Sequence, residues 1–212
     1  MKFKLDLHVH TSRSNDAVTL VTDIPAICRQ RSLDGVAITD HNLLATDFPG
    51  GIIAIRGMEV SSKDGHVLGL GLNRAVQRGL SADATVREIH DSDGLVIIPH
   101  PYDWFRSSVK LHLLRERPDA VETINASSLF HWIPWRKARD YADREKLPSV
   151  AGSDSHIPDT IGRAYTQFEA ETRDERSLLE ALKRGLVSPQ GQTLRLSERL
   201  RKRRMQASKS VG

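Results

Sequence analysis

The sequence contains a single cysteine and no long run of apolar residues. One cysteine among 212 residues, Cys28, excludes an internal disulfide framework and is typical of a reducing cytoplasm. Cys28 falls in the apolar pattern of a predicted helix, which favours core packing over metal ligation. The sequence contains no run of about 18 apolar residues, so we expect no membrane span. The first predicted strand begins almost at Met1 and leaves no room for a signal peptide, so we expect a cytoplasmic protein.

The chain also lacks a large net charge, but its charge of +4 is unevenly distributed. Residues 195–212 carry seven Lys or Arg and one Glu, a charge of +6, so the rest of the chain carries −2. We expect a body over residues 1–193 and a basic tail over 194–212 that is helical or partly disordered. The tail either docks through Leu196 and Leu200, one helical turn apart, or remains loose. It favours a short single-stranded nucleic acid as partner, whereas the acidic body argues against a long nucleic-acid groove.

Short apolar strands alternate with helical stretches along the body. We predict strands at residues 3–9, 36–39, 51–60, 66–72, 95–98, 120–124, 149–152 and 163–168, and helices at 22–31, 83–91, 110–115, 135–145 and 175–184. Such alternation predicts parallel strands joined by right-handed crossovers. Seven or eight units favour a small or distorted β/α barrel over an open sheet.

The first predicted strand carries two histidines on one face. Apolar residues alternate with Asp6, His8 and His10, and side chains at positions i and i+2 project from the same side of a strand. His8 and His10 could therefore share one metal ion. A strand with a solvated polar face gives the same pattern, so this segment alone leaves both interpretations open.

Further side chains that can bind metals lie at or just beyond the ends of most predicted strands, and one, His66, opens a strand. They are Asp16, Asp40, His41, Glu59, His66, His100, Asp154 and His156. Because the carboxyl ends of parallel strands meet at one rim of a barrel, we expect these side chains to converge. So many carboxylates and imidazoles are costly to gather without cations, and they match the ligands of Zn, Mn or Fe. The pattern predicts several divalent ions.

Five short motifs resemble those of a known family. They are Asp6–Thr11 (DLHVHT), Thr39–Asn42 (TDHN), Gly57–Val60 (GMEV), Pro99–Pro101 (PHP) and Gly152–His156 (GSDSH). Their order over about residues 1–190 is similar to that of the PHP (polymerase and histidinol phosphatase) family of metal-dependent phosphoesterases. The resemblance implies a distorted (β/α)7 barrel with two or three divalent ions of Mn, Fe or Zn.

The resemblance also implies how the ligands are shared. The first set is His8, His10, Glu59 and Asp154. The second set shares Glu59 and adds His66 and His100, and the third is Asp16, His41 and His156. Asp64 is the alternative to His66, and some relatives have histidine in place of Asp16. Asp6 and Asp40 fit residues that orient the ligand histidines.

Metal ions a few ångströms apart would hold a hydroxide that is nucleophilic at neutral pH and attacks phosphorus in line with the leaving oxygen. The predicted catalytic residues are Glu59, Asp154, His156 and Arg163. Arg163 is our first choice for the phosphate contact, ahead of Arg13, Arg106 and Arg136. Asn125, at a strand end on the same rim, would donate to the substrate or orient a ligand.

The sequence is rich in aromatic residues only near two loops. Trp104, Phe105, Trp132 and Trp135 form either a wall on which a nucleobase stacks or a cover over the top of the barrel. In the same stretch, His131 fits packing better than ligation. His90 and His112 lie in helical patterns and are expected at the surface.

The main functional hypothesis is a phosphoesterase that hydrolyses a phosphomonoester of a small metabolite or nucleotide. The second is a 5′-end exonuclease or phosphodiesterase acting on short oligonucleotides, and the third, on family grounds, is histidinol phosphate hydrolysis. A hypothesis of another class is a non-catalytic, metal-stabilised module that binds RNA or a protein through the tail. The complete set of ligand-competent positions argues against that last hypothesis.

Overall fold

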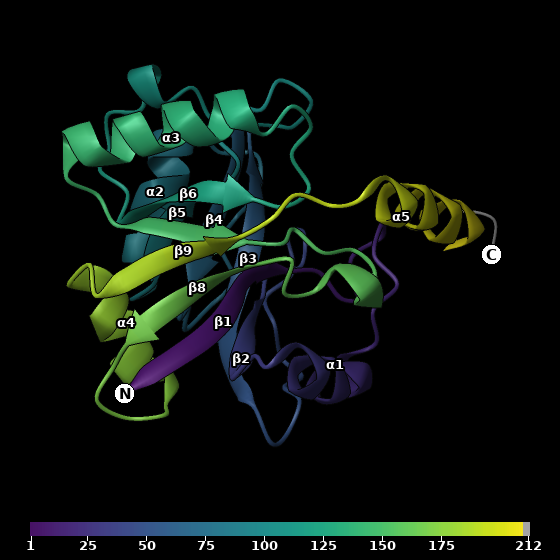
Figure 1. The fold of residues 1–212 in the computed structure, drawn as a ribbon. Coiled ribbons are helices and arrows are strands. Elements are labelled where there is room, and N and C mark those ends of the chain that lie inside the picture. Colours follow the sequence, from purple (N-terminus) through teal and green to yellow (C-terminus); the bar gives the residue numbers. More distant parts are fainter. Residues whose placement is uncertain (210–212) are drawn as a thin grey trace.

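The fold is built on one curled sheet of nine strands, shown in Figure 1. The computed structural model describes residues 1–209, and residues 210–212 of the predicted tail lie outside this range. The strands are β1 (Lys2–Val9), β2 (Gly35–Ile38), β3 (Ile53–Ser62), β4 (Gly65–Leu70), β5 (Leu95–Ile98), β6 (Ala120–Asn125), β7 (Ser149–Gly152), β8 (Ala164–Glu169) and β9 (Val187–Gly191). Their order in the sheet is β7-β6-β5-β4-β3-β2-β1-β8-β9.

Strands β1 to β7 close into a barrel because the chain just after β7 returns to β1. Val9 and Ser155 form a parallel bridge, and the His10 N–H donates to the Ser155 carbonyl at 2.9 Å. The buried Asp6 carboxylate fastens the same seam by accepting the N–H groups of Ser153 and Gly162, each within 2.8 Å. The predicted distorted (β/α)7 barrel is confirmed.

The prediction of uniformly parallel strands is wrong for β4 and for β8, which pairs antiparallel with β1. β4 pairs antiparallel with both β3 and β5, because only Lys63 and Asp64 connect β3 to β4 and a parallel crossover needs a dozen or more residues. The first residues of β4 therefore lie at the carboxyl end of β3. The sequence did not reveal β9, since its segment is polar and contains Pro189, which is typical of a loop or an edge strand.

Helices cover the outside of the sheet, as Figure 1 shows. They are α1 (Ile24–Arg31), α2 (Ala82–His90), α3 (Trp132–Glu145) and α4 (Glu175–Lys183), whereas α5 (Leu196–Lys209) lies beside the barrel. Apolar residues one turn apart bury against the strands, as Leu178 and Leu182 do in α4. The predicted helix at 110–115 is only a 3-10 turn, Leu111–Leu113. Over the described part of the chain, no helix is both long enough and apolar enough to cross a membrane.

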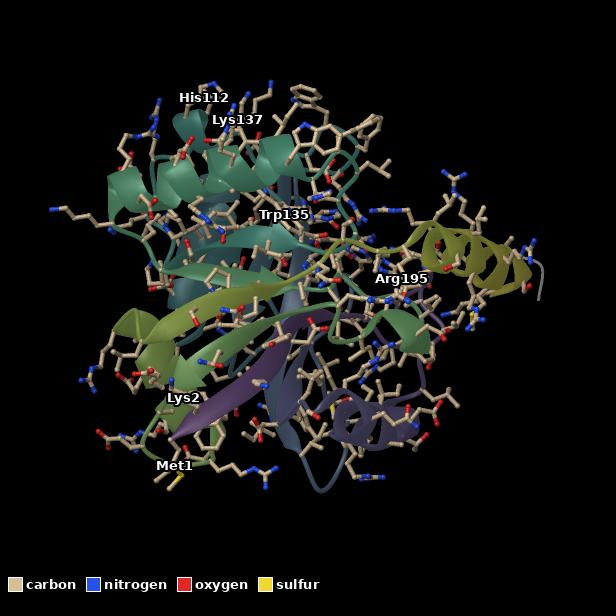
Figure 2. All side chains as sticks on the ribbon, in the orientation of Figure 1. Met1, Lys2, His112, Trp135, Lys137 and Arg195 are labelled. Atoms are coloured by element: carbon tan, nitrogen blue, oxygen red, sulfur yellow. The ribbon has the colours of Figure 1, made fainter. Side chains whose placement is uncertain are left out.

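Helix α5 docks through polar groups, so neither of the two alternatives expected for the tail, docking through leucines or remaining loose, describes it. Leu196 and Leu200 are 74% and 48% exposed, and α5 has no buried residue. Instead, Lys209 Nζ donates to three backbone carbonyls of residues 12, 14 and 17. Arg199 donates to the carbonyls of Ser127 and Ser128, both at 2.9 Å. In Figure 1 the yellow α5 projects beside the barrel, and Figure 2 labels Arg195 where the chain enters it.

The apolar cluster beneath α1 contains Cys28, whose side chain is fully buried with Ile24, Val36 and Ile38. Burial raises the pKa of the Cys28 thiol to about 12. We therefore expect the native protein not to react with Ellman's reagent at pH 8, and to react fully in guanidinium chloride, as measured by absorbance. The protonated thiol favours the folded state, so this contribution is complete below pH 9 and is lost as the pH rises towards 12. Stoichiometric reaction of the native protein within minutes would contradict the buried position.

Candidate metal centre

The carboxylate of Glu59, near the carboxyl end of β3, is surrounded by imidazole rings. Its side chain is 1% exposed, and ring nitrogens of five histidines lie within 3.5 Å of its oxygens. The shortest of these distances, 2.9 Å, are those to His41 Nδ1 and His66 Nδ1. The others are His8, His10 and His100. Glu59 is therefore the centre of the predicted ligand cluster.

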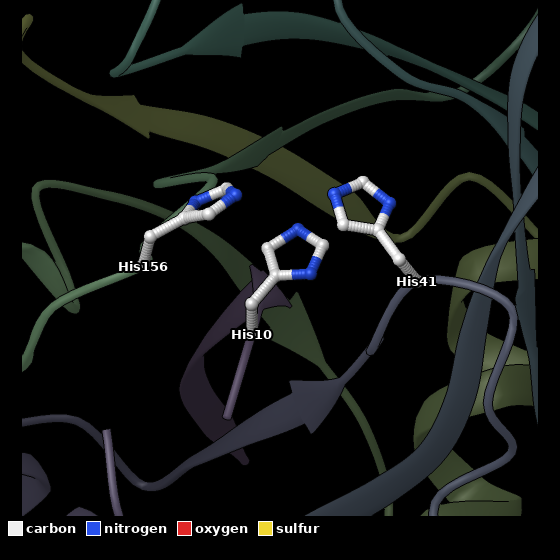
Figure 3. A group of neighbouring side chains, drawn as sticks. All are labelled: His10, His41 and His156. Carbon is white, nitrogen blue, oxygen red and sulfur yellow. The ribbon is translucent and has the colours of Figure 1, made fainter. Parts of the chain in front are cut away.

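These histidines come together because each lies at one rim of the barrel. His8 and His10 lie at and just beyond the end of β1, and His41, His100 and His156 follow β2, β5 and β7. His66 lies near the start of β4, which reaches the same rim because β4 runs in the opposite direction. Figure 3 shows the rings of His10, His41 and His156 converging from three separate segments.

Two aspartates complete the cluster. Asp154 Oδ1 lies 3.7 Å from His10 Nε2 and 3.4 Å from His156 Nδ1. Asp16 Oδ2 lies 2.9 Å from His156 Nε2 and 3.6 Å from His41 Nε2. All nine sequence-predicted ligand positions thus meet at one rim. Asp64, the alternative to His66, points elsewhere and accepts the N–H of Ala82.

Four groups of three side chains offer atoms that all lie within 4.8 Å of one another. They are His10, His41 and His156; His8, His10 and Glu59; His8, His100 and Asp154; and His41, Glu59 and His66. These groups overlap with the predicted ligand sets without reproducing them. The division of the ligands between two or three ions therefore stays a prediction.

Two buried ring nitrogens support the metal interpretation. His8 Nε2 and His10 Nε2 are buried and have no hydrogen-bond partner among residues 1–209. Buried polar atoms are nearly always paired, and both nitrogens face the carboxylates of Glu59 and Asp154. Neutral imidazole nitrogens beside carboxylate oxygens are a donor set that divalent transition metals take. The residues present therefore fit divalent ions.

The electrostatics of the cluster keep its carboxylates ionised. Burial by itself opposes ionisation, but His8 and the other surrounding imidazoles hold the pKa of Glu59 well below its usual range. Against the same burial, Arg106 and His8 hold the pKa of Asp154 well below its usual range. Burial and the neighbouring His156 lower the pKa of His10 well below its usual value, which favours the neutral ring that a metal needs.

Glu122 is a buried acidic residue beside the cluster that sequence reasoning missed. It is buried in β6, with Oε1 3.0 Å from His8 Nδ1. Its Oε2 accepts the backbone N–H of His100 at 2.7 Å and the side-chain amide of Asn125 at 2.8 Å. Glu122 therefore turns His8 Nε2 towards the cluster. A lone acidic residue inside a predicted buried strand is the signal that would have revealed it.

Asp6 and Asp40 do not orient histidine rings directly, in contrast to the prediction. Asp6 accepts backbone N–H groups at the seam of the barrel. Asp40 accepts from Thr11 and from the hydroxyl of Ser14, which lies 3.5 Å from His10 Nδ1. The oxygens of both carboxylates accept hydrogen bonds from nearby backbone and hydroxyl groups. Asp6 and Asp40 therefore stabilise the backbone that carries the ligands.

Of the arginines expected at the cluster, Arg106 reaches it, but the first choice, Arg163, pairs elsewhere. Arg163 pairs with Glu198 of α5, and Arg13 hydrogen-bonds Thr46, so neither guanidinium contacts the nine predicted ligands in the part of the protein described. Arg106 forms an ion pair with Asp154. Lys202 Nζ, from α5, lies 3.1 Å from His156 Nδ1. A residue of the predicted tail therefore reaches the cluster.

Replacing Glu122 with glutamine removes the charge that orients His8 and preserves the side-chain shape. We expect Mn²⁺ or Zn²⁺ affinity to fall roughly 10- to 100-fold. The measurement is metal titration by calorimetry, with bound metal counted by elemental analysis. Glu116→Gln, at a surface ion pair with Arg87, is the matched control. Equal affinities of wild type and Glu122→Gln would show that Glu122 does not support the ligand set.

Comparisons with known proteins find a family match, similar sequences and similar folds. A family model described as PHP-associated matches residues 132–187. An uncharacterised protein of Methanocaldococcus jannaschii is 31% identical over 142 residues, which cover 58% of this chain and 82% of that protein. A Bacteroides vulgatus structure, a two-domain protein containing a predicted PHP-like metal-dependent phosphoesterase, has a TM-score of 0.71 at 18% identity. The alignment covers 91% of this chain and 65% of the other.

Endonuclease Q, solved with a 27-mer duplex substrate that has an abasic lesion at the active site, has a TM-score of 0.64 at 19% identity. That alignment covers 86% of this chain and 57% of endonuclease Q, so this chain spans less than two thirds of either solved neighbour. At these identities the solved structures bear on the fold alone. The family match and the more similar relative show that this chain belongs to the PHP family.

Proposed function

We propose that this protein hydrolyses a phosphomonoester of a small metabolite or nucleotide, using two or three divalent ions held by the nine clustered side chains. The observation that carries the proposal is the pair of buried, unpartnered nitrogens, His8 Nε2 and His10 Nε2, facing Glu59 and Asp154. Divalent ions bound there would lower the pKa of a bound water towards neutral and would supply a positive field for the phosphate.

The protein's own residues would then hold the phosphate in place. Glu59, Asp154 and His156 remain the proposed catalytic ligands. Arg106 and Lys202 border the cluster, and their charges would neutralise the non-bridging oxygens of the phosphate. We assign the direct phosphate contact to Arg106. Arg163 would act indirectly, by holding Glu198 and therefore α5 in position.

Wild-type protein with added Mn²⁺ should hydrolyse a chromogenic aryl phosphate, and Asp154→Asn or His10→Gln should lose at least about 100-fold in kcat. Both substitutions remove a ligand and leave the apolar core unchanged, so circular dichroism should show a folded barrel. His112→Gln, at an exposed position labelled in Figure 2, is the control and should retain activity. No turnover by wild type with any divalent ion, combined with tight RNA binding, would instead support the non-catalytic module.

Exposed aromatic rings favour a second candidate, 5′-end cleavage of short oligonucleotides. Phe105 and Trp132 are 64% and 59% exposed, and Phe130 lies between them with ring centroids at 6.1 Å and 5.5 Å. Bases stack on such rings. Trp135 is different, since its indole N–H donates to the Asn125 carbonyl at 3.2 Å beneath α3 (Figure 2). The exposed rings of Phe105 and Trp132 therefore fit the predicted stacking wall, whereas Trp135 fits the predicted cover over the barrel.

If this second candidate is correct, Trp132→Ala should raise KM for a 5′-phosphorylated oligonucleotide roughly tenfold, because one base–ring stack is lost. Hydrolysis of the aryl phosphate should not change. Steady-state kinetics on both substrates test this, with Phe48→Ala as a control at another exposed aromatic residue. An unchanged KM for the oligonucleotide would remove the support that these rings give to the nuclease.

A further inference from the structure

A positively charged pocket of about 260 Å³ lies between α5 and the loops that follow β5 and β6. Four of its lining residues are basic and one is acidic: Arg106, Arg199, Lys202 and Arg203, with Asp103. The remaining walls include Phe105 and Leu129. A pocket with four cationic side chains and one carboxylate has an excess positive charge, so it favours an anion.

Hydrogen bonds hold two of these cations close together. Arg106 and Arg199 both donate to the backbone carbonyl of Ser127, at 3.4 Å and 2.9 Å. Arg199 also donates to the Ser128 carbonyl and to Thr193 Oγ1. Burial, together with the nearby Arg106, lowers the pKa of Arg199. Like charges held this close repel, and an anion placed between them would relieve that repulsion.

The pocket adjoins the candidate metal centre because two side chains belong to both. Arg106 lines the pocket and pairs with Asp154, while Lys202 lines the pocket and lies 3.1 Å from His156 Nδ1. A molecule that binds the metal centre through one group can therefore place a second anionic group in this pocket.

We propose that this pocket is a second anion site, which binds a further phosphate group of the substrate whose ester lies at the metal centre. The proposal rests on the proposed phosphoesterase function and specifies its substrate as one with two phosphates. Phosphate suits the site better than carboxylate, because a dianion balances the excess of cations and arginine forks bind phosphate oxygens in pairs. The two phosphates belong either to a small bisphosphorylated metabolite or to a phosphorylated dinucleotide.

Kinetics with paired substrates test the proposal. One pair is a hexose 1,6-bisphosphate against a hexose 6-phosphate, and the other is a 5′-phosphorylated dinucleotide against a 5′-mononucleotide. Arg203→Ala should raise KM about tenfold for the two-phosphate member of the natural pair, with kcat and the one-phosphate member unchanged. The pair that shows this effect identifies the source of the second phosphate. Arg204→Ala, at the adjacent exposed residue of α5 that does not line the pocket, should change neither.

The proposal is overturned if Arg203→Ala affects one- and two-phosphate substrates equally, or if Arg204→Ala has the same effect as Arg203→Ala. Calorimetric titration of chelator-treated protein with inorganic phosphate gives a readout without activity. Weaker binding by Arg203→Ala than by wild type and Arg204→Ala supports the anion site even if no phosphoester is hydrolysed. In that case only the proposed function fails. Equal phosphate binding by all three proteins overturns the anion site even if the enzyme is active.

Discussion

The structure depends on one constraint, which is the burial of the Glu59 carboxylate among five imidazole rings. An ionised carboxylate is costly to bury, and the charge of His8 with hydrogen bonds from His41, His66 and His100 offsets that cost at Glu59, as Arg106 does at Asp154. The geometry of the barrel follows from the same need, because only a closed set of strands delivers residues from β1 to β5 to a single point. The antiparallel β4 belongs to this arrangement, since its reversal brings His66 to the rim.

The ligand residues at the rim could be predicted from the sequence, but the contact of Glu122 with the ligand His8 could not. The ligand positions could be predicted because each follows an apolar strand, and strand ends gather wherever parallel strands form a barrel. The pairing of Glu122 with His8 could not be predicted, since the two residues lie 114 positions apart and only the registers of β1, β6 and β7 bring them together. The direction of β4 depends on a two-residue connection, which the predicted strand bounds, separated by residues 61–65, did not reveal.

The tail shows how charge can organise a segment that has little apolar surface. Its excess of basic residues was evident in the sequence, but its leucines suggested the wrong face. Backbone carbonyls of loops beside the metal centre accept from Arg199 and Lys209, and Asp159 pairs with Arg201 of α5. Lys202 consequently reaches the candidate metal centre, and Arg203 lines the adjoining pocket. The slightly negative body and the positive helix are two parts of one electrostatic arrangement.

The position of the ligand cluster across the seam between β1 and β7 also links metal binding to the stability of the fold. Asp6 and Ser153, hydrogen-bonded across that seam, are 147 positions apart in the chain, and candidate ligands lie on both sides, with His8 and His10 on one and Asp154 and His156 on the other. An ion coordinated from both sides acts as a reversible cross-link that closes a loop of this length. In polymer terms, such a closure removes about 5 kcal/mol of chain entropy from the unfolded ensemble. The same ions that would polarise a phosphate would then also stabilise the closed barrel, because they would link its two sides at the seam.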